Sequence, residues 1–169
     1  MLGMPVEKMP DPNAPISFGS KDITDLSQKS LLDAYTCTEC GRCTDNCPAN
    51  LTGKKLSPRK IMMDTRDRIE EVGKSIRKKG ADYKDEKLLL GDYISEEEIF
   101  ACTTCNACVE ACPININPLN IILELRRYKA MEEVKGPNEW NMMYSNIETS
   151  FSPWKFAPTN RFNWKDEVK

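Results

Sequence analysis

Apolar side chains recur at helical spacing in several segments of the chain, and no segment shows sustained strand-like alternation. The clearest helical segment lies between Ser57 and Gly80. Ser57 followed by Pro58 suits the first positions of a helix, and Gly80 suits its end. The side chains expected on the buried stripe of this helix are Ile61, Met62, Ile69, Val72 and Ile76.

Local start and stop signals predict further helices. Ser95 and Glu98 have the spacing of a capping box, which predicts a short helix leading into Cys102. Asn117 and Pro118 open another segment, and Gly136 with Pro137 would break it. The other predicted helices cover residues 25–35, 119–134 and 138–148, and residues 80–94 are predicted to be a loop. The sequence therefore predicts a mostly α protein.

Two short runs carry all eight cysteines, and each run has the spacing C-x2-C-x2-C-x3-C-P. The first run contains Cys37, Cys40, Cys43 and Cys47, and the second contains Cys102, Cys105, Cys108 and Cys112. This is the spacing of bacterial proteins with two [4Fe–4S] clusters, in which the fourth cysteine of each run ligates the other cluster. We therefore predict that cluster 1 is held by Cys37, Cys40, Cys43 and Cys112, and cluster 2 by Cys102, Cys105, Cys108 and Cys47.

Other uses of these cysteines fit the sequence less well. Structural zinc sites usually pair two ligands, a longer spacer and two more ligands, often with histidine, and this chain has no histidine. Plant-type [2Fe–2S] centres have a different spacing. A disulfide framework is unexpected because the N-terminus lacks the features of a secretory signal.

The composition limits the remaining function classes. Leu, Ile, Val and Phe make up only about a fifth of the chain, so we expect the metal clusters to help form the core. The net charge of −2 argues against non-specific nucleic-acid binding. Phosphate-binding and nucleophile-elbow motifs are absent from the sequence, so no catalytic residue is proposed. Arg42, inside the first run, would raise the reduction potential of cluster 1 if it points at the cluster rather than into solvent.

The two cysteine runs, the long helical segment between them and the C-terminal tail resemble the ferredoxin part of the heterodisulfide reductase C/D group. That group includes the iron–sulfur subunits of glycolate, lactate and anaerobic glycerol-3-phosphate oxidation. The resemblance covers about residues 22–164 and implies an α-helical ferredoxin fold. We expect an extended arm or linker over residues 1–21, the dicluster domain over 22–135, and a helix with a docking tail over 136–169.

The tail sequence SPWKFAPTNRFNW, residues 152–164, resembles the stretch that joins the ferredoxin part of that group to a cysteine-rich catalytic domain. Pro153, Trp154, Arg161 and Trp164 match it, whereas Ser152 replaces the usual asparagine. The resemblance implies that Trp154, Arg161 and Trp164 dock a partner. An ordinary tail with packed tryptophans is the alternative.

The combined prediction is a non-catalytic electron-transfer component of an oxidoreductase complex. Its expected partners are a catalytic protein with C-C-G motifs, which this sequence lacks, and an electron donor or acceptor protein; a fragment of a longer protein is the alternative. The competing functions are a free soluble ferredoxin and a metal-stabilised structural or sensing module. We expect a cytoplasmic location, and the resemblance adds association with the inner face of the cytoplasmic membrane through a partner or an anchor missing from this sequence.

Overall fold

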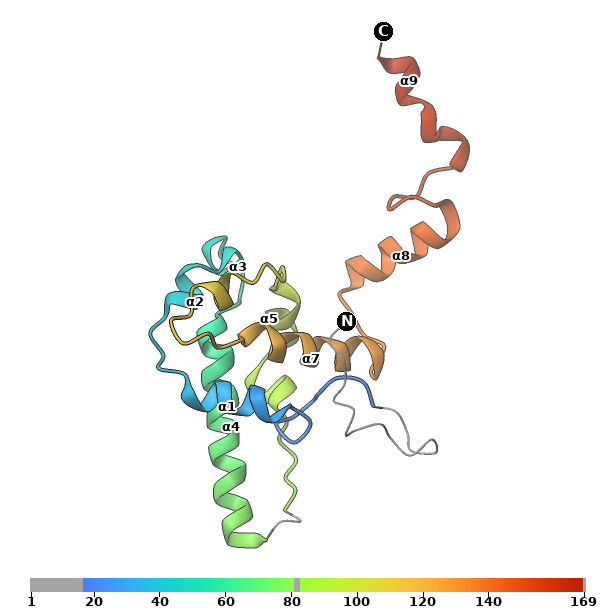
Figure 1. Ribbon diagram of the computed structural model, residues 1–169. Helices are drawn as coiled ribbons and strands as arrows, with labels where there is room; N and C mark the ends of the chain where they lie inside the picture. The colour runs from blue at the N-terminus through green and yellow to red at the C-terminus, as the bar shows by residue number, and fades with distance from the viewer. Residues whose placement is uncertain (1–16, 81–82, 169) are drawn as a thin grey trace. The chain divides into compact units, whose positions relative to one another are not determined.

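The computed structural model describes residues 17–80 and 83–168 (Figure 1). The described residues up to Glu133 form one compact unit, and those from Val134 onward form a second. In the described ranges there are helices and no strands, apart from one isolated bridge between Leu90 and Ile94. The mostly α class predicted from the sequence is confirmed.

The first unit is organised around α4, Pro58–Lys79, against which α1, Gln28–Thr36, and α7, Pro118–Met131, both pack (Figure 1). The predicted start of α4 is confirmed, because the Ser57 hydroxyl accepts the backbone N–H of Lys60. The predicted end is confirmed as well: Gly80 has a positive φ of 99° and donates its N–H to the carbonyl of Ile76.

The predicted apolar stripe of α4 is correct at Ile61, Met62 and Val72, which are buried. Ile69 packs against the core while remaining partly buried. The prediction is wrong at Ile76, which is 38% exposed because the last turns of α4 extend past the helices that cover its first half (Figure 1).

Short helices place the two cysteine runs at one end of this unit. The first run includes α2, Arg42–Asp45, and leads into α3, Pro48–Leu51. The second run lies between α5, Glu96–Ala101, and α7, and contains α6, Ala107–Glu110. The predicted capping box of α5 is confirmed, since Ser95 accepts the N–H of Glu98 and the Glu98 carboxylate accepts the N–H of Ser95.

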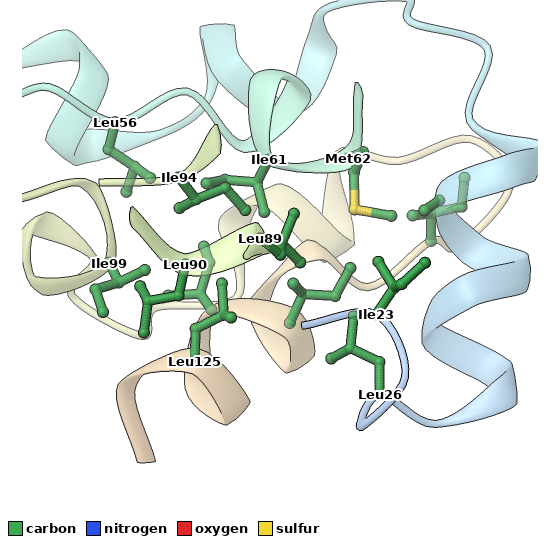
Figure 2. Close-up of a cluster of buried hydrophobic side chains, with 14 of the residues drawn as sticks. Ile23, Leu26, Leu56, Ile61, Met62, Leu89, Leu90, Ile94, Ile99 and Leu125 are labelled. Atoms are coloured by element: carbon green, nitrogen blue, oxygen red, sulfur yellow. The ribbon is translucent and has the colours of Figure 1, made fainter. Parts of the chain in front are cut away.

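The segment predicted as a loop before α5 contributes to the core. A tight turn, η2, covers Leu89–Tyr93, and its residues Leu89 and Leu90 are buried. Figure 2 shows these two side chains among apolar residues of α4, α5, α7 and the segment before α1. The labelled core residues are Ile23, Leu26, Leu56, Ile61, Met62, Leu89, Leu90, Ile94, Ile99 and Leu125 (Figure 2).

Residues 1–16 of the predicted N-terminal arm lie outside the described residues. Where the structure describes this arm, it runs against α7: the N–H of Ser20 donates to the carbonyl of Glu124 at 3.1 Å, and the N–H of Phe18 donates to the Glu132 carboxylate at 2.6 Å. These contacts attach the segment that precedes α1 to the helix that follows the second cysteine run.

The second unit contains α8, Asn138–Ser150, a 3-10 turn, η3, Pro158–Phe162, and α9, Trp164–Glu167. The helix predicted over residues 138–148 is therefore confirmed as α8. No residue of α8 is buried, and several large apolar side chains of this unit are exposed.

Candidate metal centres

The two cysteine runs fold into loops with the same backbone pattern. Glu39 and Thr104, between the first and second cysteines of their runs, both have positive φ, at 57° and 59°. Gly41 and Asn106, between the second and third cysteines, also have positive φ, at 84° and 63°. Left-handed residues in tight loops turn successive N–H groups inward and create concave sites for anions. The internal repeat in the sequence is thus also a repeat of backbone conformation.

A first cavity, with a volume of about 360 Å³, is lined by five of the eight cysteines. Four of them are Cys37, Cys40, Cys43 and Cys112, the ligand set predicted for cluster 1, and the fifth is Cys108. α4 and the start of α7 supply apolar parts of the wall through Met62 and Pro118.

A second cavity, with a volume of about 310 Å³, is lined by Cys47, Cys102, Cys105 and Cys108, the ligand set predicted for cluster 2. Its other walls are mainly apolar side chains of α4, α7 and the preceding loops. Since Cys108 borders both cavities, the two sites lie next to each other.

Each cavity has the donor set that a [4Fe–4S] cluster requires, namely four cysteine thiols around an enclosed space. In the described part of the chain, no three metal-binding side chains are placed to hold a single metal ion, because each set of thiols surrounds a volume rather than a point. The residues therefore fit a multi-atom cluster.

Backbone N–H groups already point at two of the cysteine sulfurs. Thr104 donates to Sγ of Cys102 at 3.4 Å, and Ile116 donates to Sγ of Cys112 at 3.3 Å. Hydrogen bonds to ligand sulfurs stabilise their negative charge and help to set the reduction potential of a cluster.

Burial shapes the chemistry of the thiols. It raises the pKa of Cys43 and Cys102, and it raises the pKa of Cys108 to about 11, where neighbouring thiols add to the effect. For the pKa of Cys102, the Thr104 N–H and the positive charge of Arg126 act in the opposite direction. These three thiols are therefore protonated at neutral pH until iron replaces their protons.

The two sites differ in how solvent and charge reach them. The second cysteine of each run, Cys40 or Cys105, is exposed, whereas Cys47 and Cys108 are buried. The first cavity has Arg59 in its wall, as well as Glu39, whose carboxylate is paired with Arg66. The described lining of the second cavity contains no charged side chain apart from its thiols.

Arg59 was missed by the sequence analysis, which considered Arg42 because it lies inside the first run. Arg42 is exposed and is not part of the described wall of either cavity. Arg59 lies two residues after its helix N-cap, and its own N–H donates to the Thr44 hydroxyl at 3.2 Å, which holds the start of α4 against α2. Only this tertiary contact brings the arginine to the cavity.

The tail residues predicted to dock a partner lie in the second unit. Trp154 is 68% exposed and Trp164 is 62% exposed. Arg161 is exposed, and its guanidinium donates to the carbonyl of Phe151 at 2.8 Å. The alternative of packed tryptophans is therefore not observed for either residue within the described part of the chain.

Comparison with known proteins agrees with the cysteine geometry. Residues 36–116 match the family model described as a 4Fe-4S dicluster domain. The chain therefore carries a 4Fe-4S dicluster domain. The eight cysteines of this domain supply ligands for two [4Fe–4S] clusters, as predicted.

Curated relatives support the predicted group. The chain is 35% identical to the "Probable iron-sulfur-binding oxidoreductase FadF" of Bacillus subtilis, with 90% of this chain and 26% of that protein covered. It is 34% identical to the "EtfAB:quinone oxidoreductase" of Syntrophomonas wolfei, with 89% and 24% covered. It is 33% identical to one subunit of a CoB-CoM heterodisulfide reductase from Methanosarcina acetivorans, with 70% and 60% covered. The resemblance of this dicluster protein to the heterodisulfide reductase C/D group is confirmed.

The dicluster chain spans about a quarter of the length of the first two relatives. Another relative, from Chromohalobacter salexigens, is named a probable membrane-anchored ferredoxin and is 30% identical over 98% of this chain and 26% of its own length. Within the described residues, no helix is both long enough and apolar enough to cross a bilayer.

Proposed function

We propose that this dicluster protein relays electrons through its two clusters, to or from a partner that is catalytic or linked to a quinone. The observation that carries the proposal is the pair of adjoining cysteine-lined cavities that share Cys108. When bound, each [4Fe–4S] cluster supplies a one-electron redox centre. Adjacent centres with no substrate-binding constellation beside them suit a relay better than a reaction site.

The proposed ligand assignment is the crossed one. Cluster 1 takes Cys112 from the second run, and cluster 2 takes Cys47 from the first. The lining of the cavities supports this assignment, because Cys112 borders the first cavity alone and Cys47 borders the second alone. Cys108 borders both, and its place within the second run assigns it to cluster 2.

The exposed ligands mark where electrons enter and leave the relay. Cys40 at cluster 1 and Cys105 at cluster 2 are the exposed cysteines of the chain. They lie in separate loops, so a donor and an acceptor can approach different clusters. The remaining ligands are at least partly shielded, which separates the clusters from bulk water.

A protein partner follows from the relatives and from the tail. The related proteins are named as oxidoreductases or as a subunit of one, and the first two are much longer than this chain. We propose that Trp154, Arg161 and Trp164 dock a subunit or domain with C-C-G motifs. Exposed tryptophan and arginine side chains are typical anchors of protein interfaces.

Metal analysis with EPR spectroscopy tests the relay. Anaerobically purified protein should contain about eight iron and eight sulfide per chain, and dithionite should produce interacting S = 1/2 signals, because the two cubes are close. Zinc without sulfide and a silent EPR spectrum would instead indicate a structural or sensing module.

Affinity capture with the complete holo-chain tests the docking proposal. The chain should retain a protein with C-C-G motifs, identified by mass spectrometry, and a Trp154→Ala/Trp164→Ala variant with unchanged iron content should lose it. Equal retention by both forms would remove the tail from the interface.

A further inference from the structure

An arginine outside the cysteine runs holds the backbone of the second run. Arg126 lies on α7, and its guanidinium reaches back to the C-terminal end of α5, where Cys102 is the cap residue. Nη2 donates to the carbonyl of Cys102 at 2.8 Å, and Nε donates to the carbonyl of Ile99 at 3.2 Å. Nη2 also donates to the same Ile99 carbonyl. The first ligand of cluster 2 is thereby tied to α7 through its own peptide group.

These contacts fix the guanidinium as well as the loop. The last carbonyls of a helix lack partners within the helix, and a cation is favoured beside them. The guanidinium also lies 5.8 Å from the centre of the Phe100 ring, and the residue is half-buried. A charge held in this way is less screened than an exposed one, so it acts more strongly on a nearby cluster.

The first cysteine run has no equivalent arrangement in the described structure. There, the helix before the first ligand, α1, has its C-terminal carbonyls bonded by an uncharged group: the Thr36 hydroxyl donates to the carbonyl of Leu32 at 2.9 Å. The N–H of Cys37 completes this end by donating to Ala34. The repeat of the cysteine loops is therefore not accompanied by a repeat of the arginine.

We propose that Arg126 is a positioning residue for cluster 2, which fixes the Cys102 end of the loop and raises the reduction potential of that cluster relative to the same site without the charge. The proposal rests on the electron-relay function proposed above. One-electron reduction adds one negative charge to a cluster, and a fixed positive charge nearby stabilises the reduced form. The second cavity has no other charged side chain in its described wall, so removal of Arg126 should be felt there.

An EPR-monitored redox titration of Arg126→Gln tests this inference, with dithionite as the electron source. The midpoint of cluster 2 should fall, with about a tenfold loss in the equilibrium constant for reduction, or about 59 mV for a one-electron couple. The midpoint of cluster 1 should change much less. Cys105→Ser assigns the midpoints, because an oxygen ligand alters the signal of the cluster that carries it.

Arg127→Gln is the matched control. Arg127 is the next residue on α7, and its guanidinium pairs with Glu124 at 2.7 Å instead of with the cysteine loop. The control changes the net charge by the same amount and should leave both midpoints in place. Equal shifts in the two variants, equal shifts of both clusters, or an unchanged cluster 2 midpoint at full iron content would overturn the inference.

Iron and sulfide content separates failure of the inference from failure of the proposed function. A wild-type protein without two clusters would remove the relay itself. If Arg126→Gln alone loses cluster 2, Arg126→Lys decides, because it keeps the charge and loses the forked hydrogen bonding. Restored iron with a midpoint nearer the wild-type value supports the positioning role, and failure to restore iron or the potential overturns it.

Discussion

Arg68 of α4 binds the carboxylate of Asp22, forty-six residues earlier in the chain, through two hydrogen bonds from one guanidinium. The distances are 3.1 Å from Nε and 2.8 Å from Nη2. The Arg68 side chain is only 1% exposed, and it also binds the Asp85 carboxylate and the carbonyl of Lys87. One buried cation thus joins the segment before α1, the middle of α4 and the segment that leads to the buried turn at Leu89.

Replacement of Arg68 by methionine should strongly destabilise the first unit. Methionine keeps much of the apolar volume but leaves the buried Asp22 carboxylate without its cation. Loss of one partner from a buried ion pair costs about 3–5 kcal/mol. Anaerobic guanidinium denaturation of the holo-protein, followed by far-UV circular dichroism, should show a clearly lower midpoint.

Lys74→Met on the same helix is the control for Arg68→Met. Lys74 pairs with Glu70 at 3.3 Å, and its side chain is 71% exposed. Exposed pairs contribute at most about 1 kcal/mol, so this variant should unfold almost like the wild type. Similar midpoints for the two variants would show that the Arg68 network adds little to stability.

Local signals predicted the helices well because their chemistry is local. Ser57, Gly80 and Ser95 act within one turn of their own helix, so the sequence around each was sufficient. The role of Arg68 was missed because an arginine next to a predicted apolar stripe is usually exposed, and its two carboxylate partners come from distant segments. The pattern of one helix does not reveal such partners.

The same distinction applies to the metal centres. The spacing within each cysteine run predicted the ligand type, and the known behaviour of this motif supplied the crossing. The spacing could not reveal that Cys108 borders both cavities, or that Arg59 and Arg126 approach different sites. Those relations depend on how α4 and α7 pack around the loops.

Arg59, rather than Arg42, should influence the potential of cluster 1. Arg59 lines the first cavity, and no described carboxylate lies within ion-pairing distance of it. Arg59→Gln should lower the cluster 1 midpoint in a redox titration, and Arg42→Gln should have the smaller effect although it is closer in sequence to a ligand. Because Arg59 is exposed, the shift should shrink at 1 M salt, where the screening length is about 3 Å. A larger shift for Arg42→Gln would contradict this assignment.

Removal of iron should unfold much of the first unit. The buried thiols of Cys47 and Cys108 lie beside apolar core residues, and the aliphatic content of the chain is low. Binding of the clusters therefore contributes to the free energy of folding. Iron-free protein should lose most of its helical signal in far-UV circular dichroism and should melt without a sharp transition. A native-like spectrum with cooperative melting would mean that the apolar core of Figure 2 is sufficient by itself.

Crossed ligation makes a paired prediction for serine variants of the two runs. Serine can still ligate iron through oxygen, so each variant should alter the EPR signal of one cluster instead of abolishing both. Cys112→Ser should alter the same signal as Cys40→Ser, although these residues lie in different runs. Cys47→Ser should alter the same signal as Cys105→Ser. The expectation follows from the cavities, since Cys112 lines the first with Cys40, and Cys47 lines the second with Cys105. If Cys112→Ser instead matches Cys105→Ser, each run holds its own cluster, and the wall shared at Cys108 would mark only the closeness of two independent sites.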